Sequence, residues 1–491
     1  MTIRDRLSRV PSAGWWCATV AFLNVAVWSA VVPPFHVPDE TAHVAYVQQL
    51  AETGKAPNDP DAGVFSDEQA RLLEALQFNA TVGRPADGTI WSKSEDRDVD
   101  DVEDAPLTGS NAGGLQSNSN QPPLYYLLGA GVYWASPSDG LLDRLVLLRL
   151  LSAALAALTT LLVFLFLRGV LIERWTWTVG ALAVAFQPTF GFISGGVTPD
   201  ALLFAASAAL FLMLARIFRR GLTLERGLAV GAVLAVGALA KLNFLALIPG
   251  ALAGLLLIAW RSHDRLRVLR AVGVAGGVLA LAGLAYVAVN ARLWDRSAWG
   301  GGLAVAETNV TGGSDGVVSI GLTERLGYTW QLYLPRLPFM NDQFTYFPPY
   351  TTWFKGGIGH FGWLDTPFPN WTYTLALVIA VPLVLLAGVA LVQRRDVLLE
   401  HWPELVTYGL MVAGLLVSIG FSGVRYRKDT GFIFEQTRYL LPLLPLYATA
   451  VALAALGAGR RLARPLGAVI VVLAIGHGLF AQLLVIGRFY A

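Results

Sequence analysis

Charged residues are scarce in this chain of 491 residues: they make up 14% of it, against 55% for apolar residues, and the mean hydropathy is +0.54. Soluble globular proteins carry roughly 25% charged residues, so this sequence has too few to surround an apolar interior with a water-facing surface. The high apolar content also excludes an intrinsically disordered chain. We therefore predict an integral membrane protein that has the lipid bilayer as its surroundings.

Cysteine is almost absent, because Cys17 is the only one in the chain. A single cysteine excludes an intramolecular disulfide and a metal site built from several cysteines. Lysine is scarce too, with 5 residues against 31 arginines, a bias typical of GC-rich bacterial genomes. The net charge of +2 leaves no broad basic surface, so nucleic acid is excluded as a partner.

Long apolar runs, in contrast, recur along the whole chain. A helix needs about 20 apolar residues to cross the hydrocarbon core of a bilayer. The first run follows an arginine-bearing start and is longer than the apolar region of a signal peptide, so it predicts an uncleaved anchor. The fold class that we expect is an all-α polytopic membrane protein with about 11 transmembrane helices. The predicted spans are 15–32, 145–167, 175–194, 200–216, 227–240, 243–260, 271–290, 371–392, 404–421, 439–457 and 465–487.

The distribution of arginine predicts the orientation of these spans. With the N-terminus inside, six short segments of 59 residues in total face the cytoplasm, and they carry 18 of the 36 Lys and Arg residues. This excess satisfies the positive-inside rule. The same alternation requires that the apolar stretch Pro122–Ala135 does not span, and its 14 residues predict a re-entrant or interfacial helix.

Two long segments then lie on the extracytoplasmic side, together with a shorter one at 422–438. Long loops on one side of a protein whose other loops are short indicate chemistry on that side. We divide the chain into an anchor helix at 1–32, a first extracytoplasmic loop at 33–143, spans two to seven at 144–290, an aromatic-rich second loop at 291–370 and spans eight to eleven at 371–491.

The first outer loop opens with the sequence HVPDETAH at 36–43. Its proline predicts a helix start that puts Asp39 and Glu40 in the first turn, and a spacing of four places Asp39 and His43 on one face. An acid pair shielded from water at a membrane surface can have a raised pKa and act as a general base. A helix cap with two solvated acids is the alternative interpretation.

An acidic stretch at 94–104 alternates aspartates as a calcium loop does. It lacks the glycine and the final glutamate of such a loop, so we predict a mobile acidic loop. The second outer loop is instead aromatic: 14 of the 44 residues between Tyr328 and Trp371 are Phe, Tyr or Trp. These rings suit an interfacial belt, and they also suit a groove for a prenyl chain or a sugar face.

Further polar residues lie at the predicted outer ends of the spans. Cations at a lipid boundary either extend to the headgroups or hold a phosphate, to which arginine donates paired N–H groups. The segments that carry them are NQPPLYY at 120–126, TPD at 198–200, AKLN at 240–243, and 422–438 with Arg425, Arg427, Lys428 and Arg438.

The order of these motifs resembles the GT-C superfamily of polytopic glycosyltransferases over about residues 30–445. The motifs are PDE-x-x-H at 38–43, G-x-x-P at 54–57, QPPLYY at 121–126, TPD at 198–200, AK at 240–241 and RYLLP at 438–442. The sequence is most similar to the arm that holds protein O-mannosyltransferases, aminoarabinose transferases and uncharacterised bacterial membrane proteins. There is one departure, because mannosyltransferases carry an acid and a histidine where this chain has Ser119, Asn120 and Gln121. It puts a protein-mannosylating role in doubt and leaves the acceptor open.

The resemblance implies an enzyme of the bacterial inner membrane that transfers a sugar from a polyprenyl-phosphate donor, with inversion, to a glycan, lipid or protein acceptor. Asp39 matches the catalytic acid residue, Glu40 assists it, and Lys241 and Arg438 match the cations that hold the lipid phosphate. The predicted accessory residues at the substrate are His43, Gln121, Tyr125 and Asp200.

The residues themselves fit this chemistry, because single displacement needs one base and one cationic clamp. We expect no cofactor: His36, Asp39, Glu40 and His43 offer ligands to a divalent metal but do not form a specific metal signature. Three alternatives stay open at this point. They are a transporter or flippase of lipid-linked sugars, a non-catalytic scaffold, and a ligase or polymerase that uses a diphosphate-linked donor.

Overall fold

The computed structural model describes residues 10–58, 63–83, 93–104, 118–297, 320–433 and 435–490. Helices dominate these ranges, and their strands are the two dipeptides β1 (His360–Phe361) and β2 (Thr366–Pro367), which pair antiparallel. The predicted all-α polytopic class is therefore confirmed.

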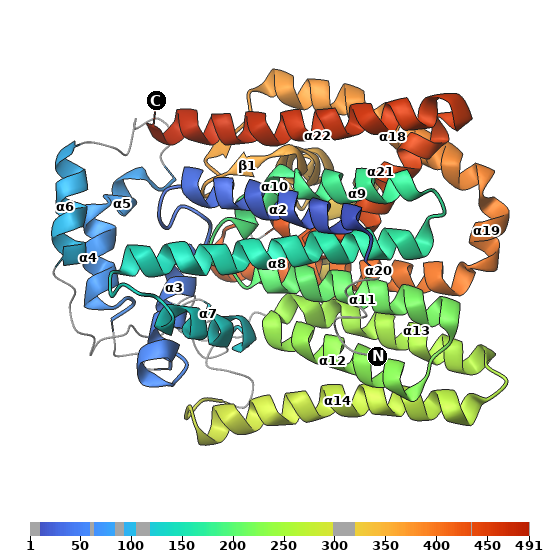
Figure 1. Ribbon diagram of the computed structural model, residues 1–491, viewed down its shortest axis with the longest axis horizontal. Helices are drawn as coiled ribbons and strands as arrows, with labels where there is room; N and C mark the ends of the chain where they lie inside the picture. Colours follow the sequence, from blue (N-terminus) through green and yellow to red (C-terminus); the bar gives the residue numbers. More distant parts are fainter. Residues whose placement is uncertain are drawn as a thin grey trace.

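Long apolar helices lie side by side in a bundle, with their axes running across Figure 1. Nine helical stretches of the described ranges are long and apolar enough to cross a membrane. The helices that contribute to them are α2 (Ser12–Val31), α8 (Leu141–Val170), α11 (Asp200–Arg220), η1 (Leu242–Leu247) with α13 (Ile248–Arg261), α14 (Arg265–Arg292), α18 (Asn370–Gln393), α20 (Trp402–Thr430), η3 (Thr437–Leu443) with α21 (Leu444–Gly457), and α22 (Gly459–Tyr490).

The other two predicted spans differ from straight membrane helices. The stretch 175–194 is a pair, α9 (Arg174–Ala185) and α10 (Pro188–Ser194), bent by 58°. The stretch 227–240 is α12 (Leu224–Ala240), whose 17 residues extend about 26 Å, less than the ~30 Å of the hydrocarbon core. The part of the chain that the structure describes thus holds nine clear spans, or ten with the bent pair, where the sequence predicts about eleven.

The bend between α9 and α10 has a local cause. Pro188 stands in the first turn of α10, where its missing N–H and its fixed φ suit a new helix. The side chain of Gln187 accepts a hydrogen bond from the backbone N–H of Phe190 and donates one to the carbonyl of Gly357. The broken span is therefore tied to the second loop.

Short helices of the first loop gather at one end of the bundle, on the left of Figure 1, which we call the loop end. They are α3 (Glu40–Thr53), α4 (Asp67–Ala75), α5 (Phe78–Thr81), α6 (Lys93–Asp104) and α7 (Leu124–Trp134). With 11 residues, α7 is about 17 Å long and cannot span a bilayer, as predicted for 122–135. The second loop adds α16 (Leu322–Tyr333), η2 (Pro349–Lys355), α17 (Gly356–Ile358) and the two strands.

The acidic stretch 94–104 belongs to the helix α6, so the mobile loop predicted there is wrong. Val99 and Val102 are three residues apart, and both pack against the hydrophobic cluster of the first loop. This spacing puts them on one face of a helix. Glu103 accepts hydrogen bonds from the N–H of Leu142, which satisfies a free donor at the start of α8.

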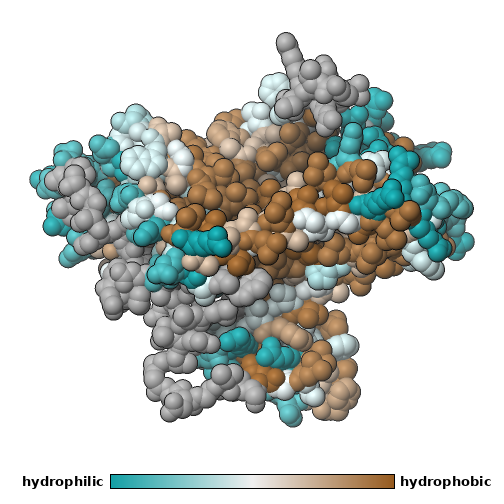
Figure 2. All heavy atoms as spheres, turned by 90° about the horizontal axis from the view of Figure 1, so that it is seen from below, coloured by the Kyte–Doolittle hydropathy of each residue, from teal (hydrophilic) through white to brown (hydrophobic). Residues whose placement is uncertain are grey.

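The opposite end carries the short connections between helices, on the right of Figure 1, and we call it the connection end. These connections are 171–173, 221–223, 262–264, α19 (Arg395–Glu400) and the turn at Ala458. Figure 2 shows a broad apolar surface between polar groups at the two sides. Exposed side chains such as Leu281 of α14 and Val384 of α18 contribute to the apolar exterior, as lipid-facing helices do. The chain is a multi-pass membrane protein.

Candidate functional site

Asp39 lies at the loop end, where its backbone has a left-handed conformation, with φ 66° and ψ 3°. A residue other than glycine in this region is uncommon, and such conformations concentrate at functional sites. The helix α3 begins at Glu40, so Asp39 precedes the first turn in which the sequence predicts it. The backbone turn separates the two neighbouring carboxylates, which have different partners.

The carboxylate of Asp39 pairs with Arg438, which lies in η3, with 2.6 Å between Oδ2 and the guanidinium nitrogen. The Arg438 side chain is 6% exposed and that of Asp39 is 32% exposed. Burial alone would raise the pKa of Asp39, but the charge of Arg438 and its hydrogen bond hold this pKa below its ordinary value. The raised pKa predicted for this carboxylate is therefore wrong, because its cationic partner outweighs its shielding.

A second ion pair joins Lys241 to Asp200, with 2.8 Å between Nζ and Oδ1. Lys241 stands at the break between α12 and η1, and Asp200 is the first residue of α11. Burial lowers the pKa of Lys241, and the charge of Asp200 opposes this shift. The charge of Lys241 also lowers the pKa of Asp39, and the charge of Arg438 lowers the pKa of Lys241. Both cations therefore lie close enough to Asp39 to influence its carboxylate.

Glu40 has a different environment from its neighbour. It is fully buried and forms two hydrogen bonds with Arg149 of α8, of 2.6 and 2.8 Å. Its Oε1 atom also accepts the backbone N–H of Val197 at 2.9 Å. Arg149 donates in addition to the carbonyls of Ser29, Val32 and Pro33 at the end of α2. Glu40 thus joins three parts of the fold and does not contact the Asp39 side chain through any of these bonds.

His43 lies one helical turn after Asp39, and its Nδ1 atom is 2.9 Å from the hydroxyl of Tyr126. The ring of Tyr126 stacks on that of Tyr46, with 3.7 Å between their centroids. Burial lowers the pKa of His43 to about 3, although Asp39 opposes the shift. This histidine is therefore neutral at physiological pH.

Gln121 and Tyr125 connect the first loop to the segments that carry the second ion pair. Gln121 accepts the N–H of Leu242, the residue after Lys241, at 3.3 Å. The hydroxyl of Tyr125 accepts the N–H of Thr198 at 3.0 Å, two residues before Asp200. The structure thus brings the eight predicted site residues to one end of the bundle, where their functional roles stay predictions.

A cavity of about 300 Å³ lies beside the Asp39–Arg438 pair. Pro38 and Arg438 line it together with α10 and the second loop. The Nε atom of Arg438 is buried, and it has no hydrogen-bond partner among the residues that the structure describes. A guanidinium with a donor to spare is suited to hold an anion at this position.

Two residues of this region are not predicted from the sequence. Arg149 is a charged residue inside the predicted span 145–167, and an ionisable group within a span is itself a signal of function. Glu435 lines the cavity and is 4% exposed. No sequence motif separates it from the other charged residues of 422–438.

The four possible metal ligands of the first loop do not converge. His36 lies between the rings of Phe78 and Phe489, whereas Glu40 faces Arg149. Within the described ranges, no three His, Cys, Asp or Glu side chains form a group that could hold a metal ion.

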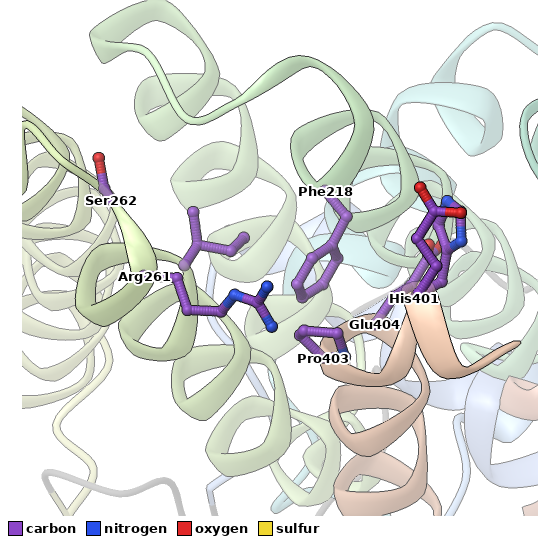
Figure 3. Close-up of a pocket in the computed structure, with 8 residues that line it drawn as sticks. Phe218, Arg261, Ser262, His401, Pro403 and Glu404 are labelled. Atoms are coloured by element: carbon purple, nitrogen blue, oxygen red, sulfur yellow. The ribbon is translucent and has the colours of Figure 1, made fainter. Parts of the chain in front are cut away.

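A second cavity, of about 330 Å³, lies at the connection end. Arg261 of α13 points toward Phe218 and Pro403, and His401 and Glu404 lie on the other side (Figure 3). Glu404 pairs with Arg219 at 3.0 Å and accepts the hydroxyl of Tyr408 at 2.7 Å.

Fold and site together define a polytopic α-helical membrane protein with buried ion pairs and a cavity at its loop end. The chain belongs to the DUF2142 family of predicted membrane proteins, whose family model matches residues 22–447. No curated protein matches the sequence.

Among solved structures, the chain is similar to the Archaeoglobus fulgidus oligosaccharyltransferase in its apo form. The TM-score is 0.46 and the sequence identity 13%. The match covers 96% of this chain and 56% of that protein, so the chain spans little more than half of its length.

Proposed function

We propose that this protein transfers a sugar from a polyprenyl-phosphate donor to a hydroxyl of a glycan, lipid or protein acceptor. In this proposal the loop end faces the extracytoplasmic side of a bacterial inner membrane, and the N-terminus lies in the cytoplasm. The observation that carries the proposal is the pair of Asp39 and Arg438: a partly exposed carboxylate held against a buried guanidinium, beside a cavity. The ordered motifs shared with GT-C glycosyltransferases support it.

Asp39 acts as the general base in the proposed reaction. The acceptor oxygen attacks the anomeric carbon as the bond from that carbon to the phosphate oxygen breaks, which inverts the configuration. Asp39 takes the proton of the acceptor hydroxyl, and the polyprenyl phosphate leaves with the electron pair of the broken bond. Because the pKa of Asp39 is held low, this carboxylate is ionised and ready to accept a proton at neutral pH.

Arg438 and Lys241 stabilise the leaving phosphate. Arg438 has a buried Nε donor beyond its bond to Asp39, and Lys241 uses one bond to Asp200, which leaves donors of its ammonium group for a ligand. In a site shielded from water, these charges stabilise the phosphate more than they would in bulk solvent.

Donor binding then strengthens the base. A phosphate that engages Arg438 competes with Asp39 for the guanidinium, which in the free protein is the main group that lowers the pKa of Asp39. Weakening this ion pair raises the pKa of Asp39 and with it the basicity of the carboxylate. Asp39 becomes a stronger base when the donor is in place. Glu40 and Arg149 are positioning residues, because they fix the turn that carries Asp39.

The test is transfer of a labelled sugar from polyprenyl-phosphate donors by the purified protein in proteoliposomes. Asp39→Asn should lower kcat by about 10²–10⁴-fold, the contribution of a positioned general base. Asp342→Asn is the matched control, because Asp342 of the second loop is 72% exposed and pairs with Arg336 on the surface. Transfer at an undiminished rate by Asp39→Asn would refute the assignment, and counterflow of the labelled donor without product would favour a transporter.

A further inference from the structure

The cavity beside Arg438 has walls of mixed chemistry. Polar groups come from the second loop and from the segment before η3, among them His360, Thr351, Gln436 and Glu435. Apolar groups come from α10, where Phe192 and Ile193 line it. Its volume of about 300 Å³ lies at the lower end of the range for small-molecule sites.

Glu435 is held in place by two neighbouring helices. The hydroxyl of Tyr328, from α16, donates to its Oε1 atom at 2.6 Å. On α20, a Cβ atom at Gly423 would clash with the same oxygen, so only glycine leaves room for the carboxylate. Glu435 is a preorganised hydrogen-bond acceptor in the wall of the cavity.

These walls do not suit the other two parts of the proposed reaction. Most of the wall is apolar, but a prenyl chain would remove Glu435, Gln436 and His360 from water and offer them no hydrogen bond. Arg438 borders the cavity and can hold the donor phosphate from the side of Asp39 and Lys241. A phosphate inside the cavity, next to Glu435, would instead meet a like charge. Burial lowers the pKa of His360, so its ring is neutral at physiological pH and offers one donor and one acceptor rather than a charge.

A sugar ring matches what remains. Its hydroxyl groups both donate and accept hydrogen bonds, and its apolar face packs on aromatic rings such as that of Tyr346, which also lines the cavity. We infer that this cavity binds the saccharide part of the acceptor, with Glu435 accepting hydrogen bonds from its hydroxyl groups. The inference rests on the proposed function, because an acceptor site needs a transfer reaction. It places the acceptor in the cavity that Pro38 and Arg438 border, away from Lys241, which does not line this cavity.

The test uses the near absence of cysteine from the chain. Cys17 is 2% exposed, so in a Cys17→Ala background an introduced cysteine is the only thiol. Thr351→Cys places it at the cavity, and Thr374→Cys places the matched control on the exposed start of α18, outside the cavity. The rate of maleimide alkylation is measured with a panel of methyl pyranosides and furanosides and, separately, with a polyprenyl phosphate.

A sugar that fills the cavity should slow alkylation of Thr351→Cys by about tenfold at ten times its dissociation constant, by mass action. It should leave Thr374→Cys unchanged. Glu435→Gln should weaken sugar binding by about tenfold, the effect of losing one hydrogen bond to a charged group, so at the same sugar concentration the protection should fall from about tenfold to about twofold. Because the amide oxygen of glutamine can still accept the Tyr328 hydroxyl, this variant keeps the contact that holds the side chain. An unchanged alkylation rate of Thr374→Cys in the Glu435→Gln background checks that it is folded.

Protection by the polyprenyl phosphate alone, or by no member of the panel, would overturn the inference even if sugar transfer is observed. The inference is also overturned if Glu435→Gln is folded and the sugar protects it to the same degree as it protects the parent. If Glu435→Gln does not fold, His360→Ala takes its place, and it should weaken protection in the same direction. Asp39→Asn should keep protection while it loses transfer. Protection without transfer in the parent would refute the proposed function and leave the saccharide site standing.

Discussion

The two ends of the bundle hold cavities of similar size, about 300 Å³ at the loop end and 330 Å³ at the connection end. At the connection end the walls are the ends of continuous helices, Arg261 is exposed above the ring of Trp402, and Glu404 is occupied by Arg219 and Tyr408. At the loop end the chain is broken at η1, at η3 and between α9 and α10. Cavity volume does not distinguish the two ends, whereas the placement of charge does.

Buried charge is concentrated at the loop end. The side chains of the Glu40–Arg149 and Asp200–Lys241 pairs are all 8% exposed or less, whereas Arg219 in the connection-end pair is 29% exposed. Buried pairs cost desolvation energy that their mutual attraction often only balances. A gain in stability therefore does not explain why the loop end keeps two such pairs next to Asp39, whereas the proposed function gives them a role.

The largest expected difference between the ends is in stability. Arg149→Met leaves Glu40 buried without its cation, which should cost about 3–5 kcal/mol. Arg219→Met at the connection end should cost less, about 1–2 kcal/mol, because Arg219 is 29% exposed and the buried Glu404 keeps the hydrogen bond from the Tyr408 hydroxyl. The measurement is the temperature at which the buried thiol of Cys17 becomes reactive toward a fluorogenic dye.

The double variant Glu40→Gln with Arg149→Met provides the control. Since it removes both charges, its loss of stability should be smaller than the sum of the losses from Glu40→Gln alone and Arg149→Met alone. Equal losses of stability from Arg149→Met and Arg219→Met would contradict our conclusion that buried charge is concentrated at the loop end.

The second effect concerns donor affinity. Arg438→Lys keeps the charge but loses the planar set of N–H donors that matches a phosphate. We expect the KM for the donor to rise about tenfold, the equivalent of one charge-assisted hydrogen bond. The same exchange at the connection end, Arg219→Lys, should leave the KM unchanged. A KM that does not respond to Arg438→Lys would remove Arg438 from the phosphate site.

The sequence predicts the membrane class and the presence of a helix at the first-loop motif, because composition and short spacing are local properties. The pKa of Asp39 cannot be predicted this way, since its cationic partner Arg438 is 399 residues away in the chain. For the same reason the sequence does not predict that Asp39 and Glu40 have different partners, since Glu40 pairs with Arg149 of α8. The helix α6 is a different case, because the spacing of Val99 and Val102 already contains the signal and the acidic composition obscures it.

A third prediction concerns pH. The acid limb of kcat/KM reports the free protein, in which Arg438 holds the pKa of Asp39 below its ordinary value, and the acid limb of kcat reports the donor complex. Activity needs the ionised carboxylate and is lost as the pH falls through its pKa. Because the bound phosphate competes for Arg438, the limb of kcat should lie at higher pH than that of kcat/KM, by about one unit. Coincident limbs would show that the donor leaves the Asp39–Arg438 pair intact.

The smallest expected effect is at the connection end itself. Arg261→Gln removes the cation that points into the larger cavity, yet the side chain is exposed, and no described carboxylate forms an ion pair with it. We expect kcat and the donor KM to change by less than about twofold, since surface substitutions away from buried networks usually cost within 0.5 kcal/mol. Steady-state transfer assays at two salt concentrations check this, because a ligand held by an exposed arginine would respond to ionic strength. A large, salt-dependent loss of activity would mean that the connection end also binds a substrate. Both ends would then be functional, and they would differ only in the ligand that each binds.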